Sequence, residues 1–487
     1  MSTADFDVIV VGAGLSGVAA AHYLQRECPA ERFVILEGRG AIGGTLDLFR
    51  YPGIRSDFDM FTLGYTFRPW TSDAQIAGGP AIRDYIRDTA RDEGILPHIR
   101  FGHHVTAANW DSGSARWLVD AESGGEALLL SCHFLFFCSG YYDYEQGHDP
   151  AWPGRETFAG RIVHPQHWPA DLDYANKQVV VIGSGATAIT LLPSLAAQAT
   201  HVTMLQRSPS YIIALPARDA IGRTLQVMLP RTLAYRLIRW KNILLSTALF
   251  QFSRRRPLAM RNWLVRQAQA RFGPAVQQRD LQPRYDPWDQ RLCIAPDADV
   301  FRAVRSGRAS IVTDEVARFV PEGIELASGR VLPADLVVTA TGLKLKMLGG
   351  ARITLDGQPL RMTESLSYKG MMLSGLPNLA MAMGYTNASW TLKCELIARQ
   401  VCRILNHMRS QGLDVCVPVL DADAGETRPA LDLSSGYIQR AAGVLPRQGS
   451  RKPWRIHQNY LRDLLALKLA PLRDGALRFA RRGEVPR

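Results

Sequence analysis

Three glycines near the N-terminus have the spacing of a turn that binds a nucleotide pyrophosphate. They follow the apolar stretch FDVIVV in the pattern G-x-G-x-x-G. Gly12 permits a tight turn, Gly14 lets a pyrophosphate approach backbone N–H groups, and Gly17 lets the next helix pack closely on the strand. Glu37 ends the following stretch, FVILE, twenty residues after Gly17. A carboxylate at that point accepts hydrogen bonds from ribose hydroxyls, so we predict a dinucleotide site.

The pattern recurs in KQVVVIGSGATAI, where Gly183 and Gly185 repeat the turn and Ala188 takes the third position. The next stretch, HVTMLQRS, ends in Arg207 and Ser208 and not in an acid. A guanidinium and a hydroxyl suit the 2′-phosphate of NADP, which a carboxylate would repel. The alternative is a surface arginine without a ligand. Two such turns predict two dinucleotides, FAD at the first and NADPH at the second, with electrons passing from NADPH to the flavin.

Two further stretches, 134–142 and 334–343, have the form of a strand followed by a glycine. The second contains Thr341 and Gly342. We expect both stretches to cross between units, where backbone approaches a flavin or forms a hinge. Thr341 and Gly342 are therefore included among the predicted cofactor-binding residues.

The chain that positions these turns has 487 residues, too many for one ordinary core. We predict an α/β protein with two Rossmann-like dinucleotide-binding domains and a helical insert. Residues 1–140 form the first part of the FAD domain, 141–330 the NADP domain with a helical insert at about 216–280, and 331–487 the second part of the FAD domain with a C-terminal segment.

The stretch FAGRIVHPQHWP at 158–169 places two histidines and a tryptophan just before the second turn. The spacing of His164 and His167 would allow metal binding, but no acid or cysteine completes a ligand set, and no metal is predicted. The stretch is similar to the fingerprint F-x-G-x-x-x-H-x-x-x-W-P of the Baeyer–Villiger monooxygenases. The matching residues are Phe158, Gly160, His164, Trp168 and Pro169.

A second signature of this family, G-G-x-W-x-x-x-x-Y-P-G-x-x-x-D, resembles GGTLDLFRYPGIRSDFDM at 43–60. The resemblance implies that Gly44, Thr45 and Asp57 lie at the flavin. Leu46 stands where the family has tryptophan, which we expect to reshape the flavin-side cavity. The stretches at 384–393 and 448–463 further resemble the subgroup of the mycobacterial ethionamide-activating monooxygenase.

The resemblance implies that NADPH reduces FAD and that O2 then gives a peroxyflavin, which attacks a ketone and yields an ester or lactone. Arg291, in YDPWDQRLC, falls at the position of the family's active-site arginine, and Asp57 would orient it. A fixed positive charge stabilises an anionic oxidant in a water-poor site. Phe158, Gly160, His164 and Trp168 would couple the domains.

Other reactions stay open. Oxidation of sulfur or nitrogen, as in thioethers, thioamides or amines, is the nearest alternative, although Trp168 favours ketones because amine- and sulfide-oxidising relatives usually carry Tyr or Phe there. A flavin-dependent reductase would need a CxxxxC pair, which the sequence lacks. A basic module that binds nucleic acid or membrane is a third reading, and we expect no nucleic acid.

Charge and cysteine usage indicate the setting. The formal net charge is +12, with arginines concentrated in 216–272 around the apolar run 243–252, which is too short to span a bilayer. We expect a helical subdomain with a solvated basic face, including Arg239, and peripheral membrane contact as the alternative. The seven scattered cysteines and the lack of a signal peptide predict a cytoplasmic protein. Oligomeric state is not predicted.

Overall fold

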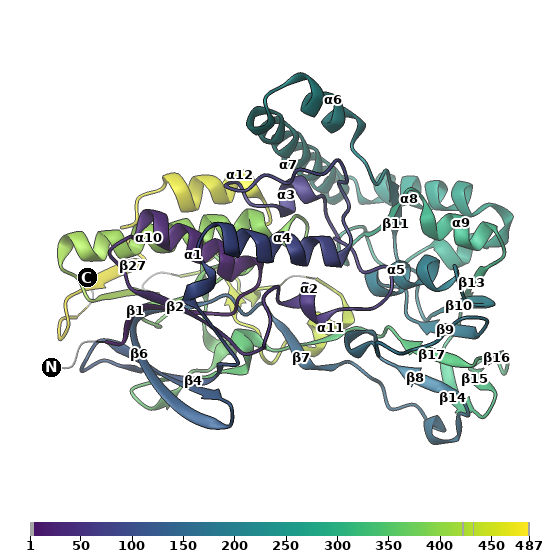
Figure 1. Cartoon of the computed structure of the whole chain (residues 1–487), viewed down its shortest axis with the longest axis horizontal. Helices are drawn as coiled ribbons and strands as arrows, with labels where there is room; N and C mark the ends of the chain where they lie inside the picture. Colours follow the sequence, from purple (N-terminus) through teal and green to yellow (C-terminus); the bar gives the residue numbers. More distant parts are fainter. Residues whose placement is uncertain (1–3, 421–422, 432, 486–487) are drawn as a thin grey trace.

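The protein is described by a computed structural model that covers residues 4–420, 423–431 and 433–485. Two α/β units lie side by side, and helices α6, α7 and α8 lie along one side of the molecule (Figure 1). The larger unit contains a nine-stranded sheet and the smaller a five-stranded sheet. The predicted fold class, two Rossmann-like units with a helical insert, is confirmed by this arrangement together with the comparisons reported below.

The first sheet forms around strands that are apolar and buried on both faces. β1 lies between β2 and β6, and all three run parallel, as expected for strands covered by helices. The first half of β6 pairs antiparallel with β5 and extends the sheet to β4, β19 and β20. The strands are β1 (Phe6–Val11), β2 (Phe33–Glu37), β3 (Ile99–Phe101), β4 (His104–Asp111), β5 (Arg116–Ser123), β6 (Glu126–Phe137), β19 (Arg352–Leu355), β20 (Gln358–Pro359) and β23 (Leu379–Met381).

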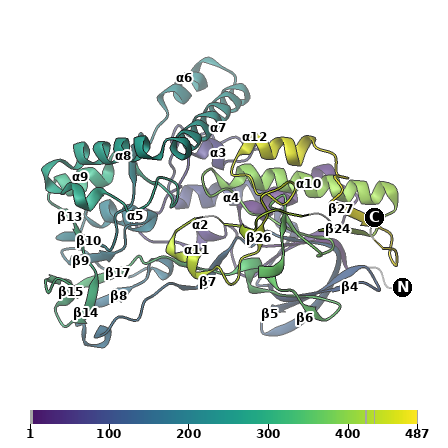
Figure 2. The same cartoon turned by 180° about the vertical axis from the view of Figure 1, so that it is seen from behind.

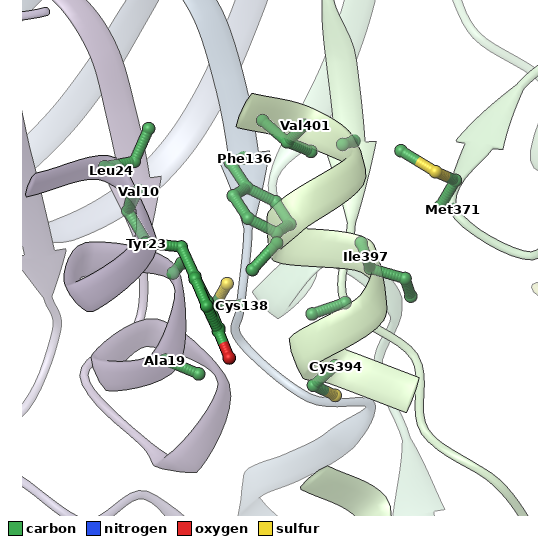
Figure 3. Close-up of a cluster of buried hydrophobic side chains, with 14 of the residues drawn as sticks. Val10, Ala19, Tyr23, Leu24, Phe136, Cys138, Met371, Cys394, Ile397 and Val401 are labelled. Carbon is green, nitrogen blue, oxygen red and sulfur yellow. The ribbon is translucent and has the colours of Figure 1, made fainter. Parts of the chain in front are cut away.

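Two helices far apart in sequence cover one face of this sheet. α1 (Leu15–Glu27) packs against α10 (Trp390–Gln411), and Figure 3 shows their side chains meeting over Val10 and Phe136. Small residues such as Ala19 let the two helices approach each other, and Ile397 is fully buried. The C-terminal part of the chain therefore completes the first unit. Other elements of this unit are α2 (Thr45–Leu48), α3 (Met60–Leu63), α4 (Gly79–Asp92) and α12 (Tyr460–Asp463).

The second sheet is wholly parallel, in the order β13-β10-β9-β17-β8. β17 belongs to it although it follows residue 330. We therefore propose that the second unit extends to Thr339, later than the boundary expected from the sequence. The elements are β8 (Arg161–Val163), β9 (Gln178–Ile182), β10 (His201–Gln206), β13 (Ala309–Thr313), β17 (Leu336–Thr339), α5 (Ala186–Leu195) and α9 (Asp299–Arg305).

The helical insert contacts both units. α6 (Ala220–Met228) and α7 (Arg231–Arg255) lie over the first unit, whereas α8 (Pro257–Phe272) packs on α9 and on β11 (Ile212–Leu215) of the second (Figures 1 and 2). α7 is fixed by Arg239, which donates to the carbonyl oxygens of Phe61 at 2.8 Å and Gly64 at 2.6 Å and to Glu395 Oε2 at 3.0 Å. The expectation that Arg239 lies on a solvated face is wrong, because acceptors in α3 and α10 compensate its burial.

Candidate functional site

The first glycine turn lies where β1 meets α1. The Gly12 N–H donates to Leu36 O at 2.8 Å, and Gly14 immediately precedes α1, so the first N–H groups of the helix point at the turn. A Cβ atom on Gly17 would lie 1.9 Å from Gly12 O, a contact that no side chain permits. The helix therefore packs against the strand end as closely as the sequence pattern predicted, which fits a pyrophosphate held on backbone N–H groups.

Glu37 lies beside this turn at the end of β2. Its Oε2 accepts from the Ala13 N–H at 2.7 Å and its Oε1 from the Arg39 N–H at 2.9 Å. Burial raises the pKa of Glu37, and the two N–H donors oppose that shift. Each oxygen keeps a free lone pair, so the carboxylate can also accept from a ribose hydroxyl, as expected.

The double-glycine signature packs directly on the first turn. The Gly43 N–H donates to Ala13 O at 3.1 Å, and Arg39 Nη1 donates to Gly44 O at 3.1 Å. Thr45 begins α2 next to them. Leu46, the residue that departs from the family pattern, packs partly buried against the hydrophobic core of the first unit. Gly44 and Thr45 are therefore placed beside the predicted flavin site.

The second turn repeats the first with different chemistry at its rim. The Gly183 N–H donates to Leu205 O at 2.8 Å, Gly185 precedes α5, and Ala188 is fully buried. Arg207 follows β10 and is exposed. The next residue's carbonyl, that of Ser208, accepts from Ser184 Oγ at 2.7 Å. The backbone geometry fits a second dinucleotide, with the exposed cationic side chain of Arg207 just after the strand.

Arg291 joins the two units through a chain of contacts. Its Nη1 lies 3.5 Å from Asp57 Oδ2, and its Nη2 donates to the Tyr141 hydroxyl at 3.1 Å. The Tyr141 ring lies 5.3 Å from the Trp390 ring, and Trp390 Nε1 donates to Ser16 Oγ at 2.8 Å. Because Ser16 lies in the first turn of α1, the predicted pair of Arg291 and Asp57 is linked to the first glycine turn.

The charge of Arg291 is only partly compensated. Its side chain is 23% exposed, its Nε is buried without a hydrogen-bond partner among the described residues, and Asp57 is half exposed. Burial raises the pKa of Tyr142 well above its ordinary value and that of Tyr437 to about 12, so both hydroxyls are neutral at physiological pH. Trp288 Nε1 is a second buried donor without an acceptor in the described part of the chain. Unpaired buried donors fit a site that receives an anionic or carbonyl group.

His164 connects the fingerprint to the boundary between the units. Its Nδ1 accepts from the Gln166 N–H at 3.2 Å, so its Nε2 carries the proton and donates to Gly342 O at 3.3 Å. Burial lowers the pKa of His164, which keeps the ring neutral. A Cβ atom on Gly147 would lie 2.0 Å from that ring. The imidazole thus fills the space between β7 (Tyr142–Gly147) and the start of β18 (Leu343–Leu345).

The other fingerprint residues pack within the second unit. Phe158 meets the Phe319 ring edge-to-face at 5.8 Å, and Trp168 packs against the core of the second unit. Gly160 lies against the backbone of Asp335, the residue just before β17, since a Cβ atom on Gly160 would be 2.5 Å from Asp335 O. Thr341 Oγ1 donates to His148 O at 2.5 Å. These contacts fit a coupling role better than a role in proton transfer.

Several residues near the site were not found from the sequence. Tyr141 bonds Arg291, Trp390 packs on Tyr141, and Tyr437 lies within the electrostatic range of Arg291. Arg440, on α11 (Gly436–Arg440), lies within the electrostatic range of Arg207. Burial and the charge of Arg207 both lower the pKa of Arg440. Trp390 lies in the stretch 384–393, which resembles the expected subgroup but carried no residue role, and the others come from distant parts of the chain and have no local pattern.

The fold and site together define a protein with two dinucleotide-binding units and a cationic group between them. The family model Flavin-binding monooxygenase-like matches residues 76–265, and NAD(P)-binding Rossmann-like domain matches residues 10–73. The chain is 51% identical over 482 residues to the FAD-containing monooxygenase EthA of Mycobacterium tuberculosis, covering 99% of each chain.

Solved structures show the same fold. A steroid monooxygenase bound to NADP superposes with a TM-score of 0.77 at 22% identity, covering 98% of this chain and 99% of that chain. A complex of OTEMO with FAD and NADP gives a TM-score of 0.76 at 18% identity, covering 98% of this chain and 100% of that chain.

The chain belongs to the family of FAD-containing monooxygenases that includes EthA. The predicted class, an NADPH- and FAD-dependent monooxygenase of the Baeyer–Villiger type acting with O2 on a small molecule, is therefore confirmed, as is the expected subgroup. The roles assigned to individual residues stay predictions.

Proposed function

We propose that this monooxygenase converts a ketone into an ester or lactone by inserting one oxygen atom of O2 beside the carbonyl. The observation that supports the proposal best is Arg291, whose guanidinium is linked through Tyr141 and Trp390 to the first glycine turn and has one partly exposed acid partner, Asp57. A cation held there stabilises negative charge that develops on the oxidant and on the carbonyl oxygen.

The first turn is proposed to hold FAD, which when bound supplies the redox and oxygen chemistry. Gly12, Gly14 and Gly17 would carry its pyrophosphate and Glu37 its ribose, with Gly44 and Thr45 beside it. Asp57 would hold the Arg291 guanidinium in orientation. The neutral hydroxyls of Tyr142 and Tyr437 leave the positive charge available to the reacting atoms.

The second turn is proposed to hold NADPH. Gly183, Gly185 and Ala188 would carry the pyrophosphate, and Arg207 and Ser208 the 2′-phosphate. Arg440 would add a second guanidinium from the other unit, because an anion between the two arginines relieves their mutual repulsion. Thr341 donates to the backbone carbonyl of His148, and the carbonyl of Gly342 accepts from the ring of His164. These two bonds would fix the segment that joins the two sites.

The test compares Arg291→Ala with Arg291→Lys and with the distant surface variant Arg318→Ala. We expect Arg291→Ala to accept hydride from NADPH, seen as flavin bleaching without oxygen, but to form at least about a hundredfold less ester from a methyl ketone, since one well-placed charge contributes roughly 3 kcal/mol. Arg291→Lys should recover part of that loss and Arg318→Ala should match wild type.

Wild-type ester formation by Arg291→Ala would overturn the residue's role. A wild-type enzyme that oxidises a methyl sulfide but leaves methyl ketones unchanged would overturn the ketone assignment and favour oxidation of sulfur or nitrogen.

We also propose a cytoplasmic location. All seven cysteines are buried and unpaired, as expected in a reducing compartment. Peripheral contact with a membrane, the alternative that the basic insert left open, is a further part of this proposal.

A further inference from the structure

One side of the molecule combines positive charge with exposed apolar side chains. Residues 220–279 contain eleven arginines and one lysine but no aspartate or glutamate. Arg239 is buried on Glu395, Lys241 pairs with Asp219, and Arg254 lies 2.6 Å from Asp289. Arg231 and Arg236 are exposed, and no acid partner for them occurs in the described part of the chain. The local field is therefore strongly positive.

Large apolar side chains project from the same helices. Val227 is 82% exposed, Met228 74% and Leu245 66%, all on α6 or α7. Scattered single hydrophobes are ordinary on protein surfaces, but a group of this size in one segment marks an interaction site. The others in this segment are Ile221, Leu233, Leu237, Trp240, Leu244, Phe252, Leu258 and Trp263.

The C-terminal segment adds to this side. α12 lies next to α7 in both views (Figures 1 and 2), and the Trp240 and Tyr460 rings meet edge-to-face at 6.0 Å. Leu465 and Leu469, in the helical turn after α12, are also exposed. We call the exposed side chains of α6, α7 and α8 and of residues 460–469 the helical face. It is held to the first unit by the buried Arg239–Glu395 pair.

We propose that the helical face docks on an anionic lipid surface, with its apolar side chains at the headgroup boundary and its arginines on the phosphates. The positive charge and the apolar side chains of the helical face together favour a lipid surface over the other possible partners. A second copy of this chain seated on the same face would bring two sets of unpaired arginines together, and a nucleic acid offers no apolar layer for Val227, Met228 and Leu245. Among the residues that the structure describes, no helix has the length and apolar character needed to cross a bilayer, so the contact is peripheral.

This inference rests on the peripheral contact included in the proposed function and not on the substrate, and its test measures binding and not turnover. The full-length FAD-loaded enzyme is sedimented with vesicles of pure phosphatidylcholine or of phosphatidylcholine with one third phosphatidylglycerol. We expect binding to the anionic vesicles only, decreasing as salt rises from low to physiological ionic strength.

Charge reversal and its matched control locate the contact. Arg231→Glu with Arg236→Glu should weaken vesicle binding by at least about tenfold, because each cation near an anionic bilayer contributes appreciably. Arg305→Glu with Arg308→Glu makes the same charge change on the exposed end of the second unit and should have little effect. Equal losses in both pairs would overturn the assignment to the helical face, since they would show attraction by net charge alone.

An apolar pair tests the second half of the proposal. Val227→Asp with Met228→Asp should abolish vesicle binding, whereas Leu129→Asp, on an exposed residue of β6, should not. Flavin content and thermal unfolding confirm that each variant is folded. Equal binding of wild type to neutral and anionic vesicles, no binding to either, or a stable dimer in solution that the Val227 and Met228 changes separate would each overturn the proposal.

Discussion

The two glycine turns make the same backbone hydrogen bond but differ at the residue that ends the neighbouring strand. In each, the first glycine N–H donates to the carbonyl of the neighbouring strand at 2.8 Å. One residue further along that neighbouring strand stands Glu37 in the first unit and Gln206 in the second. Glu37 bonds the Ala13 N–H at 2.7 Å, but the Gln206 amide turns away to Asp280 O at 2.7 Å and to Thr313 Oγ1 at 2.9 Å.

The proposed assignment of the two ligands rests on this difference. The carboxylate of Glu37, bonded to the turn, favours free ribose hydroxyls. The Gln206 amide points away from the second turn, so that Arg207 is the charged side chain nearest the strand end, which favours a phosphate. The third position differs as well, since Gly17 leaves no space for a side chain while the second unit accommodates Ala188. The first turn therefore has less space at this position than the second.

The sharpest test of this tightness is Gly17→Ala. The added Cβ cannot fit 1.9 Å from Gly12 O, so α1 must shift away from β1. We expect the variant to lose about 3 kcal/mol of stability or more and to purify without flavin. Flavin absorbance relative to protein absorbance and thermal unfolding measure both effects.

Its control is Ala188→Gly in the second turn. Here a methyl group is removed from the start of a helix, and the cost is about 1 kcal/mol with flavin retained. If Gly17→Ala kept its flavin and unfolded like Ala188→Gly, the two turns would be equally tolerant and the comparison would fail.

Glu37→Gln tests the ribose contact with a smaller effect. A glutamine oxygen can accept from only one of the Ala13 and Arg39 N–H groups, and its NH2 group is left facing the other. We expect FAD to bind some thirtyfold more weakly, at a cost of about 2 kcal/mol. Titration of apoprotein with FAD gives the dissociation constant; an unchanged value would remove Glu37 from the site.

Arg207→Ala is expected to have the smallest effect of the three. Loss of one charge-assisted contact with the 2′-phosphate should raise KM for NADPH about tenfold and leave KM for NADH unchanged. Steady-state NAD(P)H oxidation with both cofactors distinguishes the two. Equal changes for NADPH and NADH would show that Arg207 does not contact the 2′-phosphate.

Local patterns in the sequence predicted the two turns well because strand, glycine turn, helix and acid all lie within about forty residues, as Gly12 to Glu37 show. The contacts that assemble Arg291 could not be predicted, because Tyr141 lies 150 residues away in sequence and no periodicity links the two. Composition also misplaced Arg239: a run rich in arginine indicates a solvated face on average, but it does not show which guanidinium finds carbonyl oxygens in the interior.

The burial of Arg239 affects how the molecule can move. The insert is part of the second unit by sequence, yet α7 is bound to α3 and α10 of the first unit, and its last turns also meet the second, where Leu249 packs against the cluster around Tyr211 and Arg254 pairs with Asp289. Any rotation of the two units relative to each other would therefore act on α7, whose first half is held by the first unit and whose last turns touch the second. The contacts of Leu249 and Arg254 at the end of α7 would then have to change, while the Arg239–Glu395 pair keeps the first half of the helix in place.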